Sequence, residues 1–312
     1  MSAVNALSPL SIGWIGAGRM GCAMAARLLG AGAAVKVWNR TAAKAAPLAE
    51  LGARIVDSPS DLAGCDVVFT MVAGPDSFLD VTTGAGGVLT HPEQTPGVLI
   101  DCTTISAEAS AAVRRAAAAR GTAMLDAPVS GNAKVVDAGK LSIVVSGDRA
   151  AFDRARPLLD ALGRGVSYVG EGERARIVKI CHNVLLGVVA QSLAEITVLA
   201  EKNGIPRRAF HAFLNDSVMG SAFTRYKAPA YVNLDLTPTF TSSLLRKDLD
   251  LGLAAARAAE VPMPLAAQAR EIVQGLIGQG YGDVDFGALL VVAAKAAGLE
   301  LAPDDEPVGT GL

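Results

Sequence analysis

Residues 11 to about 170 alternate short apolar runs with alanine-rich stretches of helical length. Near-continuous apolar runs of this kind are typical of parallel strands that helices cover on both faces. The runs are Ile12–Ile15, Ala34–Trp38, Arg54–Val56, Val67–Val72, Val98–Asp101, Ala123–Asp126, Ile143–Val145 and Val166–Val169. The helical stretches between them are Met20–Leu29, Ala42–Leu51, Ala107–Arg120 and Ala151–Leu162. The alternation predicts an α/β fold in which right-handed βαβ units build a doubly wound parallel sheet.

The strand pattern stops after Gly172, and the rest of the chain is predicted to be helical. Glu173–Asn203 is predicted to form one long helix, which spans about 45 Å at roughly 1.5 Å per residue. Further helices are predicted over Arg207–Asn215, Leu244–Glu260, Leu265–Gln279 and Gly287–Ala297. A chain of 312 residues also exceeds the roughly 250–300 residues of a single core. We therefore expect two domains, residues 1–170 with the sheet and residues 171–312 all-α, joined by the long helix.

Charge and apolar patterning exclude several classes of protein. Lys and Arg number 28 against 30 Asp and Glu without any basic block, so neither a nucleic-acid nor a membrane partner is expected. The longest run without a polar residue is Phe286–Ala294, nine residues against the roughly 20 that span a bilayer. No basic residue precedes Arg19, unlike in a secretory signal, and the four scattered cysteines lack zinc or disulfide spacing. These features predict a soluble cytoplasmic protein without a bound metal.

Glycines at the end of the first predicted strand form a G-x-G-x-x-G pattern. The first glycine permits a tight turn, the second lets a pyrophosphate approach the backbone, and the third lets the following helix pack against the strand. The N-terminus of that helix presents N–H groups and a partial positive charge to phosphates. A glycine-rich turn without a ligand is the alternative. In this strand–turn–helix setting the pattern predicts a dinucleotide site with contacts from Gly16, Ala17, Gly18, Arg19 and Met20.

The end of the second predicted strand indicates which dinucleotide is bound. An NAD site usually has an acidic residue here, which accepts hydrogen bonds from the ribose 2′-hydroxyl. This chain has Asn39, Arg40 and Thr41 instead, and a guanidinium beside a hydroxyl suits a 2′-phosphate. Alternatively, Arg40 is a solvated surface residue and Thr41 only caps the next helix. We expect NADP(H) as the preferred cofactor, with NAD(H) possible.

Four segments together resemble the β-hydroxyacid dehydrogenases, the family of 3-hydroxyisobutyrate dehydrogenase and tartronate semialdehyde reductase. The segments are Ile15–Gly21, Asp126–Gly131, the pair Lys179 and Asn183, and Lys247-Asp248-Leu249. They follow the family's order and spacing over nearly the whole chain. The resemblance implies a Rossmann-type domain, a long connecting helix and an all-α domain. It also implies hydride transfer between NAD(P)(H) and a small carboxylate, interconverting a β-hydroxy acid and its semialdehyde or 3-oxo acid.

The resemblance implies that Lys179 is the general acid/base and that Asn183 hydrogen-bonds the substrate or holds the lysine. The two residues are four apart on the predicted long helix, so they project from one face. A lysine can donate a proton near neutral pH only if burial or a nearby cation lowers its pKa. Without the resemblance, Lys179 would be interpreted as a lysine that extends from an apolar helix into water.

The resemblance also places the substrate carboxylate at Ser130 and Gly131, in the loop that follows the strand Ala123–Asp126. A hydroxyl beside an unshielded glycine amide suits a carboxylate. At the next position the family usually has a second glycine, and this chain has Asn132. We expect Asn132 to contact the substrate, which then carries an extra polar group or differs in size.

Further cofactor contacts are implied at a loop, a threonine and a lysine. The loop holds Val72, Ala73 and Ser77, although Ala73 and Ser77 replace the family's usual Pro and Asn. Thr104 matches a threonine near the nicotinamide ribose, and Lys247 matches a lysine that closes over the cofactor. The alternative for Lys247 is an exposed helix charge paired with an adjacent aspartate.

Three other functions remain open. Lys179, His182 and Asn183 also resemble 6-phosphogluconate dehydrogenases, but Leu186 stands where that group has a glutamate. Imine reductases generally replace the lysine, and some relatives are non-catalytic scaffolds. The apolar stretch Gly287–Ala297 exceeds what a small domain needs, which predicts a homodimer or homotetramer.

Overall fold

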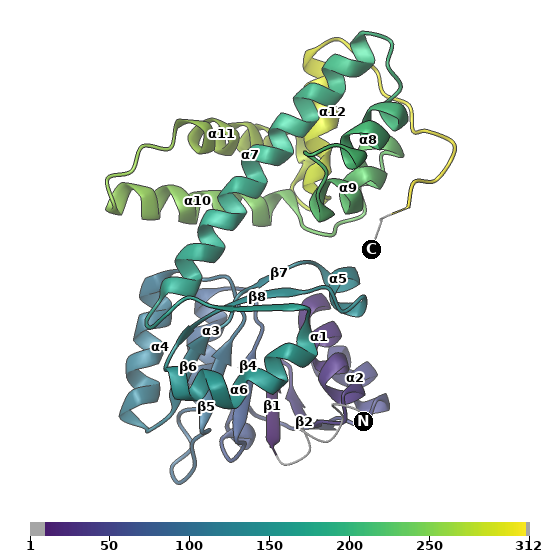
Figure 1. Ribbon diagram of the computed structural model, residues 1–312. Coiled ribbons are helices and arrows are strands. Elements are labelled where there is room, and N and C mark those ends of the chain that lie inside the picture. Colours follow the sequence, from purple (N-terminus) through teal and green to yellow (C-terminus); the bar gives the residue numbers. More distant parts are fainter. Residues whose placement is uncertain (1–9, 310–312) are drawn as a thin grey trace. The chain divides into compact units, whose positions relative to one another are not determined.

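The computed structural model describes residues 10–309 as two compact units, the first ending at Lys179 and the second beginning at Ile180. The first unit is a sheet with helices on both faces, and the second is built from helices (Figure 1). The predicted fold class is confirmed. The bounds of most elements agree with the predicted runs to within a few residues.

The sheet of the first unit has the order β3-β2-β1-β4-β5-β6-β8-β7, with β9 paired to β8. Its strands are β1 (Ser11–Ile15), β2 (Ala34–Trp38), β3 (Arg54–Ile55), β4 (Val67–Thr70), β5 (Val98–Asp101), β6 (Ala123–Asp126), β7 (Val129–Ser130), β8 (Ser142–Gly147) and β9 (Gly165–Tyr168). From β3 to β6 all pairs are parallel, whereas β8 runs antiparallel to β6 and β7. The sheet is therefore parallel only in part, because no crossover helix of full length connects β6 to β8.

Successive residues of the central strands face opposite helical layers. Ile12 and Trp14 pack with α1 (Arg19–Gly30) and α6 (Arg149–Leu162) on one face, and the Trp14 and Phe69 rings stack at 5.2 Å. Ile15 packs on the other face with α3 (Pro75–Thr83) and α4 (Ala107–Ala119). This alternation explains why the strands are apolar on both sides.

Some predicted elements of the first unit differ in detail. Ala42–Leu51 is divided into a 3-10 turn over Ala42–Ala45 and the helix α2 (Ala46–Glu50), with Pro47 in the first turn of α2. Proline suits that position because its missing N–H would have no partner there. The helices α3 and α5 (Ala133–Asp137) and the strand β7 were not predicted. The last two are too short for a periodic pattern to reveal them.

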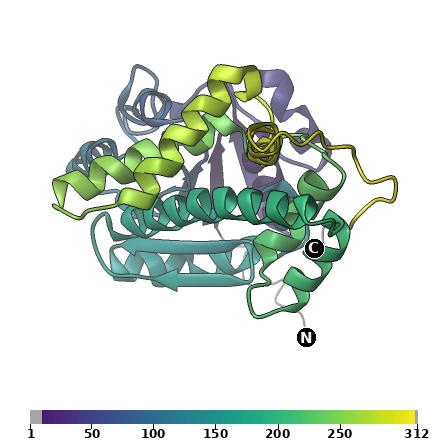
Figure 2. The ribbon, with the colours of Figure 1, turned by 90° about the horizontal axis from the view of Figure 1, so that it is seen from above.

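The long helix α7 runs from Arg174 to Lys202 and contains the boundary between the two units, at Lys179 and Ile180. Figure 2 shows it as the long teal-green helix, seen from the side. By length and composition alone it could cross a membrane, with a mean hydropathy of 1.6 over its most apolar window. Half of that window is buried within the protein, as in the core helices of many folds. The expectation of no membrane-spanning helix was based only on uninterrupted apolar runs. Polar residues interrupt the apolar sequence of α7, so this criterion did not detect it.

The second unit adds α8 (Arg207–Asp216), α9 (Ala222–Val232), α10 (Ser242–Ala258), α11 (Pro264–Leu276) and α12 (Leu289–Ala296) (Figure 1). The helix α9 was not predicted. Residues Ile277–Tyr281 continue from α11 as a wider turn that contains Gly280 with φ +91°, so the α-helix ends at Leu276, before the end of the predicted helix Leu265–Gln279.

The stretch that contains α12 is part of the core of the second unit. Phe286, Leu289, Leu290 and Ala294 are at most 1% exposed and pack with α7, α10 and α11. The apolar excess at Gly287–Ala297 is therefore explained by burial within one chain. Its use as evidence for an oligomer was wrong, and the homodimer or homotetramer stays a prediction.

His211 is a buried histidine in this second core. It is 2% exposed, and its Nε2 lies 3.1 Å from the Thr197 hydroxyl, which itself donates to the Leu193 carbonyl. Nε2 is therefore the protonated nitrogen. Burial, with a smaller effect of the Arg207 charge, lowers the pKa of His211 to about 4.

We predict that this histidine makes the protein sensitive to acid. Between pH 6.5 and 4, His211 binds a proton in the unfolded chain but not in the native protein. The free energy of unfolding therefore decreases as the pH is lowered through this range, by up to about 3 kcal/mol. Denaturant titrations at several pH values measure this slope. His211→Gln should flatten it by about one proton, whereas His91→Gln on the half-buried His91 should not. Equal slopes for the wild type and His211→Gln would contradict the prediction.

Candidate functional site

The turn from β1 to α1 requires glycine at two of its three glycine positions. Gly16 has φ +104°, and a Cβ there would lie 2.2 Å from the Met71 carbonyl oxygen. A Cβ on Gly21 would lie 2.0 Å from the Gly16 carbonyl oxygen, so helix and turn pack without room for a side chain. At Gly18 no atom lies within 4 Å of the added Cβ. The backbone at Gly18 is thus open to a ligand, which is the role expected of the second glycine.

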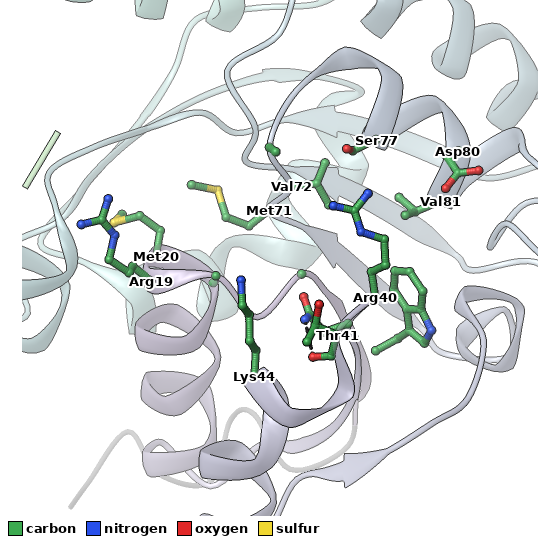
Figure 3. A pocket seen from close by; sticks show the side chains of 16 residues that line it. Arg19, Met20, Arg40, Thr41, Lys44, Met71, Val72, Ser77, Asp80 and Val81 are labelled. Atoms are coloured by element: carbon green, nitrogen blue, oxygen red, sulfur yellow. Dashed lines mark hydrogen bonds between the residues drawn. The ribbon is translucent and has the colours of Figure 1, made fainter. Parts of the chain in front are cut away.

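A pocket of about 310 Å³ lies at this turn, between the ends of β1, β2 and β4 (Figure 3). The predicted cofactor residues that line it are Gly16, Gly18, Arg19, Met20, Asn39, Arg40, Thr41, Val72, Ala73 and Ser77. Ala17 and Thr104 of the same unit do not line it. Lining residues that the sequence interpretation did not assign to cofactor binding include Lys44, Met71, Asp80 and Val81. The N-terminus of α1 faces the pocket, and Gly18 provides no side-chain cap there, so the geometry fits a phosphate group.

Asn39 links the glycine turn after β1 to the end of β2 through two hydrogen bonds. Its Oδ1 accepts a hydrogen bond of 2.8 Å from the Ala17 N–H, and its Nδ2 donates one of 2.8 Å to the Thr41 carbonyl. The Ala17 N–H is therefore used within the protein, and Ala17 is 3% exposed. Ala17 is thus part of the framework beside the pocket, and its direct contact with a cofactor stays a prediction.

Basic side chains dominate the rim of the pocket near β2. Arg40 and Lys44 extend into the pocket from the same side as Thr41, opposite Val72 and Ser77 (Figure 3). The Thr41 side chain makes no capping hydrogen bond to the following turn, so the alternative that Thr41 serves only as a cap is wrong. Lys44 could have been found in the sequence as the next basic residue after Arg40.

The loop after β6 holds the predicted substrate residues. Gly131 has φ +141°, and a Cβ there would lie 2.8 Å from Val135 Cγ1, so the turn requires glycine. Asn132 accepts a hydrogen bond of 3.1 Å from the Val135 N–H and is the N-cap of α5. The oxygen that was expected to meet substrate is thus used to start a helix. An asparagine three residues before the capped N–H is the sequence signal that was missed.

A buried ion cluster lies where β5 and β6 end. Arg176 Nη2 lies 2.7 Å from Asp101 Oδ2 and 2.7 Å from Asp126 Oδ1, and Arg176 Nη1 donates to the Thr103 carbonyl at 2.8 Å. Arg114 bridges Asp126 and Glu173, at 2.7 Å to each. The sequence analysis did not identify this cluster, although both aspartates end apolar strands.

Two carboxyl groups of the cluster have shifted pKa values. Burial raises the pKa of Asp126 to about 7, against the opposite effect of the Arg176 and Arg114 charges. Although burial acts the other way, the interactions with Asp126 and Arg114 lower the pKa of Glu173.

Lys179 lies in α7, three residues after Arg176, and is half-buried. Asn183, in the second unit, is 3% exposed and donates to Asp248 Oδ2 at 2.5 Å. Its Oδ1 lies 2.9 Å from His182 Nδ1. Lys247 lies 3.3 Å from Asp248 Oδ1, which is the ion pair of the alternative interpretation.

Comparison with known proteins gives matches along most of the chain. Residues 11–170 match the family described as the NAD-binding domain of 6-phosphogluconate dehydrogenase. Residues 173–293 match the family described as the NAD-binding domain of NADP-dependent 3-hydroxyisobutyrate dehydrogenase.

Individual relatives agree with these family matches. The chain is 36% identical to 3-hydroxyisobutyrate dehydrogenase of Pseudomonas aeruginosa, over 84% of this chain and 90% of that protein. It is 32% identical to glyoxylate/succinic semialdehyde reductase 2 of Arabidopsis thaliana, over 93% and 81%. The crystal structure of 3-hydroxyisobutyrate dehydrogenase from Salmonella typhimurium superposes with a TM-score of 0.82 at 29% identity, over 91% of this chain and 99% of that one.

We predict that Asn132 acts through the helix it caps. Asn132→Ala should lower the free energy of unfolding by about 1 kcal/mol, whereas Asn132→Asp, which keeps the accepting oxygen, should lower it much less. Denaturant unfolding of both variants measures the difference. A substrate role predicts another result, in which both variants keep their stability and both raise the KM of the acid.

Proposed function

Since the chain belongs to the β-hydroxyacid dehydrogenase family, whose members bind NAD(P), we propose that it interconverts a small β-hydroxy acid and its semialdehyde or 3-oxo acid. NADP(H) is the preferred cofactor in this proposal. The observation that carries it is the pocket at the β1–α1 turn, which combines an open glycine backbone, a helix N-terminus and a basic rim.

The preference for NADP(H) is supported by charge. Arg40 and Lys44 line the pocket beside Thr41, and no carboxylate follows β2 to accept a ribose hydroxyl. Asp80 is the acidic lining residue, on the opposite wall. Arg40 and Lys44 would hold the 2′-phosphate, and the first turn of α1 would hold the pyrophosphate.

The acid–base step is assigned to Lys179. A bound nicotinamide would supply the hydride in reduction and accept it in oxidation. Lys179 gives a proton to the carbonyl oxygen in reduction and takes the hydroxyl proton in oxidation. Its half-buried position one turn after the anchored Arg176 supports this role.

The substrate carboxylate is assigned to Ser130 and Gly131. Gly131 has φ +141°, a backbone conformation that favours glycine, and the loop follows the carboxyl end of β6, where parallel sheets bind ligands. Since the Asn132 oxygen caps α5, the substrate needs no extra polar group to match it. A short unbranched or singly branched acid is therefore the class we expect.

Asn183 acts indirectly in this proposal. Its hydrogen bonds to Asp248 and His182 fix its amide, so it orders the middle of α7. A non-catalytic scaffold is the competing function, and it requires that cofactor binding be retained without turnover on any short β-semialdehyde or β-hydroxy acid.

We predict that Arg40→Ala raises the KM for NADPH about tenfold or more, because charged hydrogen bonds to the 2′-phosphate are lost. The KM for NADH should change little. Lys44→Ala should act in the same direction, and Arg54→Ala, on β3 outside the pocket, is the matched control. Steady-state kinetics with both cofactors measure the effect, and equal changes for NADPH and NADH would contradict the assignment.

We predict that Lys179→Ala lowers kcat at least about 100-fold while NADPH binding, followed by fluorescence, is retained. The control is Lys202→Ala, the same substitution at the exposed end of the same helix. A panel of short β-hydroxy acids and semialdehydes supplies the substrates. Turnover of Lys179→Ala close to that of the wild type would refute the proposed acid–base role.

A further inference from the structure

Arg176 is a fully buried guanidinium whose partners come from two separate segments, the end of β5 with its following loop and the end of β6. Its side chain is 1% exposed and contacts Asp101 at the end of β5, Asp126 at the end of β6, and the carbonyl of Thr103 in the loop after β5. Asp101 and Asp126 are paired in the register of the parallel strands, so their side chains leave the sheet next to each other. Nη2 contacts both carboxylates and Nη1 contacts the Thr103 carbonyl, and the planar guanidinium fixes the two nitrogens relative to each other, which a lysine ammonium cannot do.

The Asp101 side of this cluster reaches the loop that lines the cofactor pocket. The Thr70 hydroxyl donates to Asp101 Oδ1 at 2.6 Å, and the Thr103 N–H donates to the same oxygen at 3.1 Å. The Thr103 hydroxyl in turn accepts the Val72 N–H at 3.1 Å, and Val72 lines the pocket. A continuous set of hydrogen bonds thus runs from the pocket wall to Arg176.

The Asp126 side holds the beginning of α7. Asp126 accepts from the Ser110 hydroxyl at 2.9 Å and pairs with Arg114, which also pairs with Glu173, directly before α7. The Ser146 hydroxyl donates to the Gly172 carbonyl at 2.7 Å and accepts the Ala175 N–H at 2.9 Å. Asp126 also begins the segment that leads within four residues to Ser130.

We propose that Arg176 is a positioning residue that sets the place of Lys179 relative to the loops after β4, β5 and β6. This inference rests on the acid–base role proposed for Lys179. A helix advances about 4.5 Å over three residues, and side chains three apart lie on neighbouring parts of one face. Fixing the Arg176 fork between two carboxylates therefore fixes the root of the Lys179 side chain. A displacement of about 1 Å at such a group can cost on the order of 100-fold in rate.

The test separates positioning from stability by comparing rate with binding. Arg176→Lys keeps the charge and loses the fork, so kcat should fall at least about tenfold. The Kd for NADPH should stay within about threefold, because the α1 and β2 ends of the pocket lie outside the cluster. Arg156→Lys is the matched control, since Arg156 forms an exposed pair with Asp160 on α6, and it should leave kcat and Kd unchanged.

A double-mutant cycle with Lys179→Ala shows whether Arg176 acts through the lysine. If it does, Arg176→Lys should have little further effect on kcat in the Lys179→Ala background. Full multiplication of the two losses would overturn the proposal, as would an unchanged kcat in Arg176→Lys. If Arg176→Lys does not fold, Asp101→Asn provides the same comparison, because the amide keeps the shape and loses the charge.

The outcomes also separate this inference from the proposed function. Normal turnover of Lys179→Ala would reject the acid–base role and the positioning role together. Loss of turnover in Lys179→Ala with normal kcat in Arg176→Lys would reject only the positioning role. Equal loss of kcat and of NADPH binding in Arg176→Lys would mean a general structural role and would likewise overturn the inference.

Discussion

The arrangement of the first unit depends on one buried guanidinium between two carboxylates. Asp101 and Asp126 are register partners on adjacent parallel strands, where like charges side by side destabilise a sheet. Removing such groups from water costs several kcal/mol per ion unless hydrogen bonds replace the solvent. Arg176 provides those bonds and approaches from α7, so the same contact that makes two buried aspartates tolerable also attaches the long helix to the sheet. Lys179 follows within one turn.

The cofactor pocket depends on backbone shape instead of charge pairing. Gly16 and Gly21 have no space for a Cβ, Gly18 faces the open pocket, and Asn39 ties the turn to the end of β2. These constraints suit any dinucleotide. The basic residues Arg40 and Lys44 also line the pocket, and in the proposed function they decide which dinucleotide is preferred. The proposal thus assigns cofactor binding and cofactor choice to different residues.

Several interpretations of the sequence did not consider contacts within the chain. Asn132 and the apolar stretch around α12 were interpreted through what they could offer to a substrate or to a second chain. In the structure Asn132 caps α5, and Leu289 and Leu290 fill the core of the second unit. Ala17 likewise supports the turn from below. In each case the group already makes a contact within the chain, as a hydrogen bond or as part of the core.

The sequence by itself determined the elements and the family, because strand and helix periodicity, glycine spacing and residue order are local properties of the chain. It also brought Lys179, Ser130 and the β2 end into consideration through motifs of a few residues. Only the tertiary structure decided that Asp101, Asp126 and Arg176 meet, since 75 and 50 residues separate the arginine from its two partners. The same holds for Lys44 and Asp80 at the pocket and for the short elements β7 and α5. Contacts between distant segments depend on how strands align in the sheet, and a local pattern contains no information on that alignment.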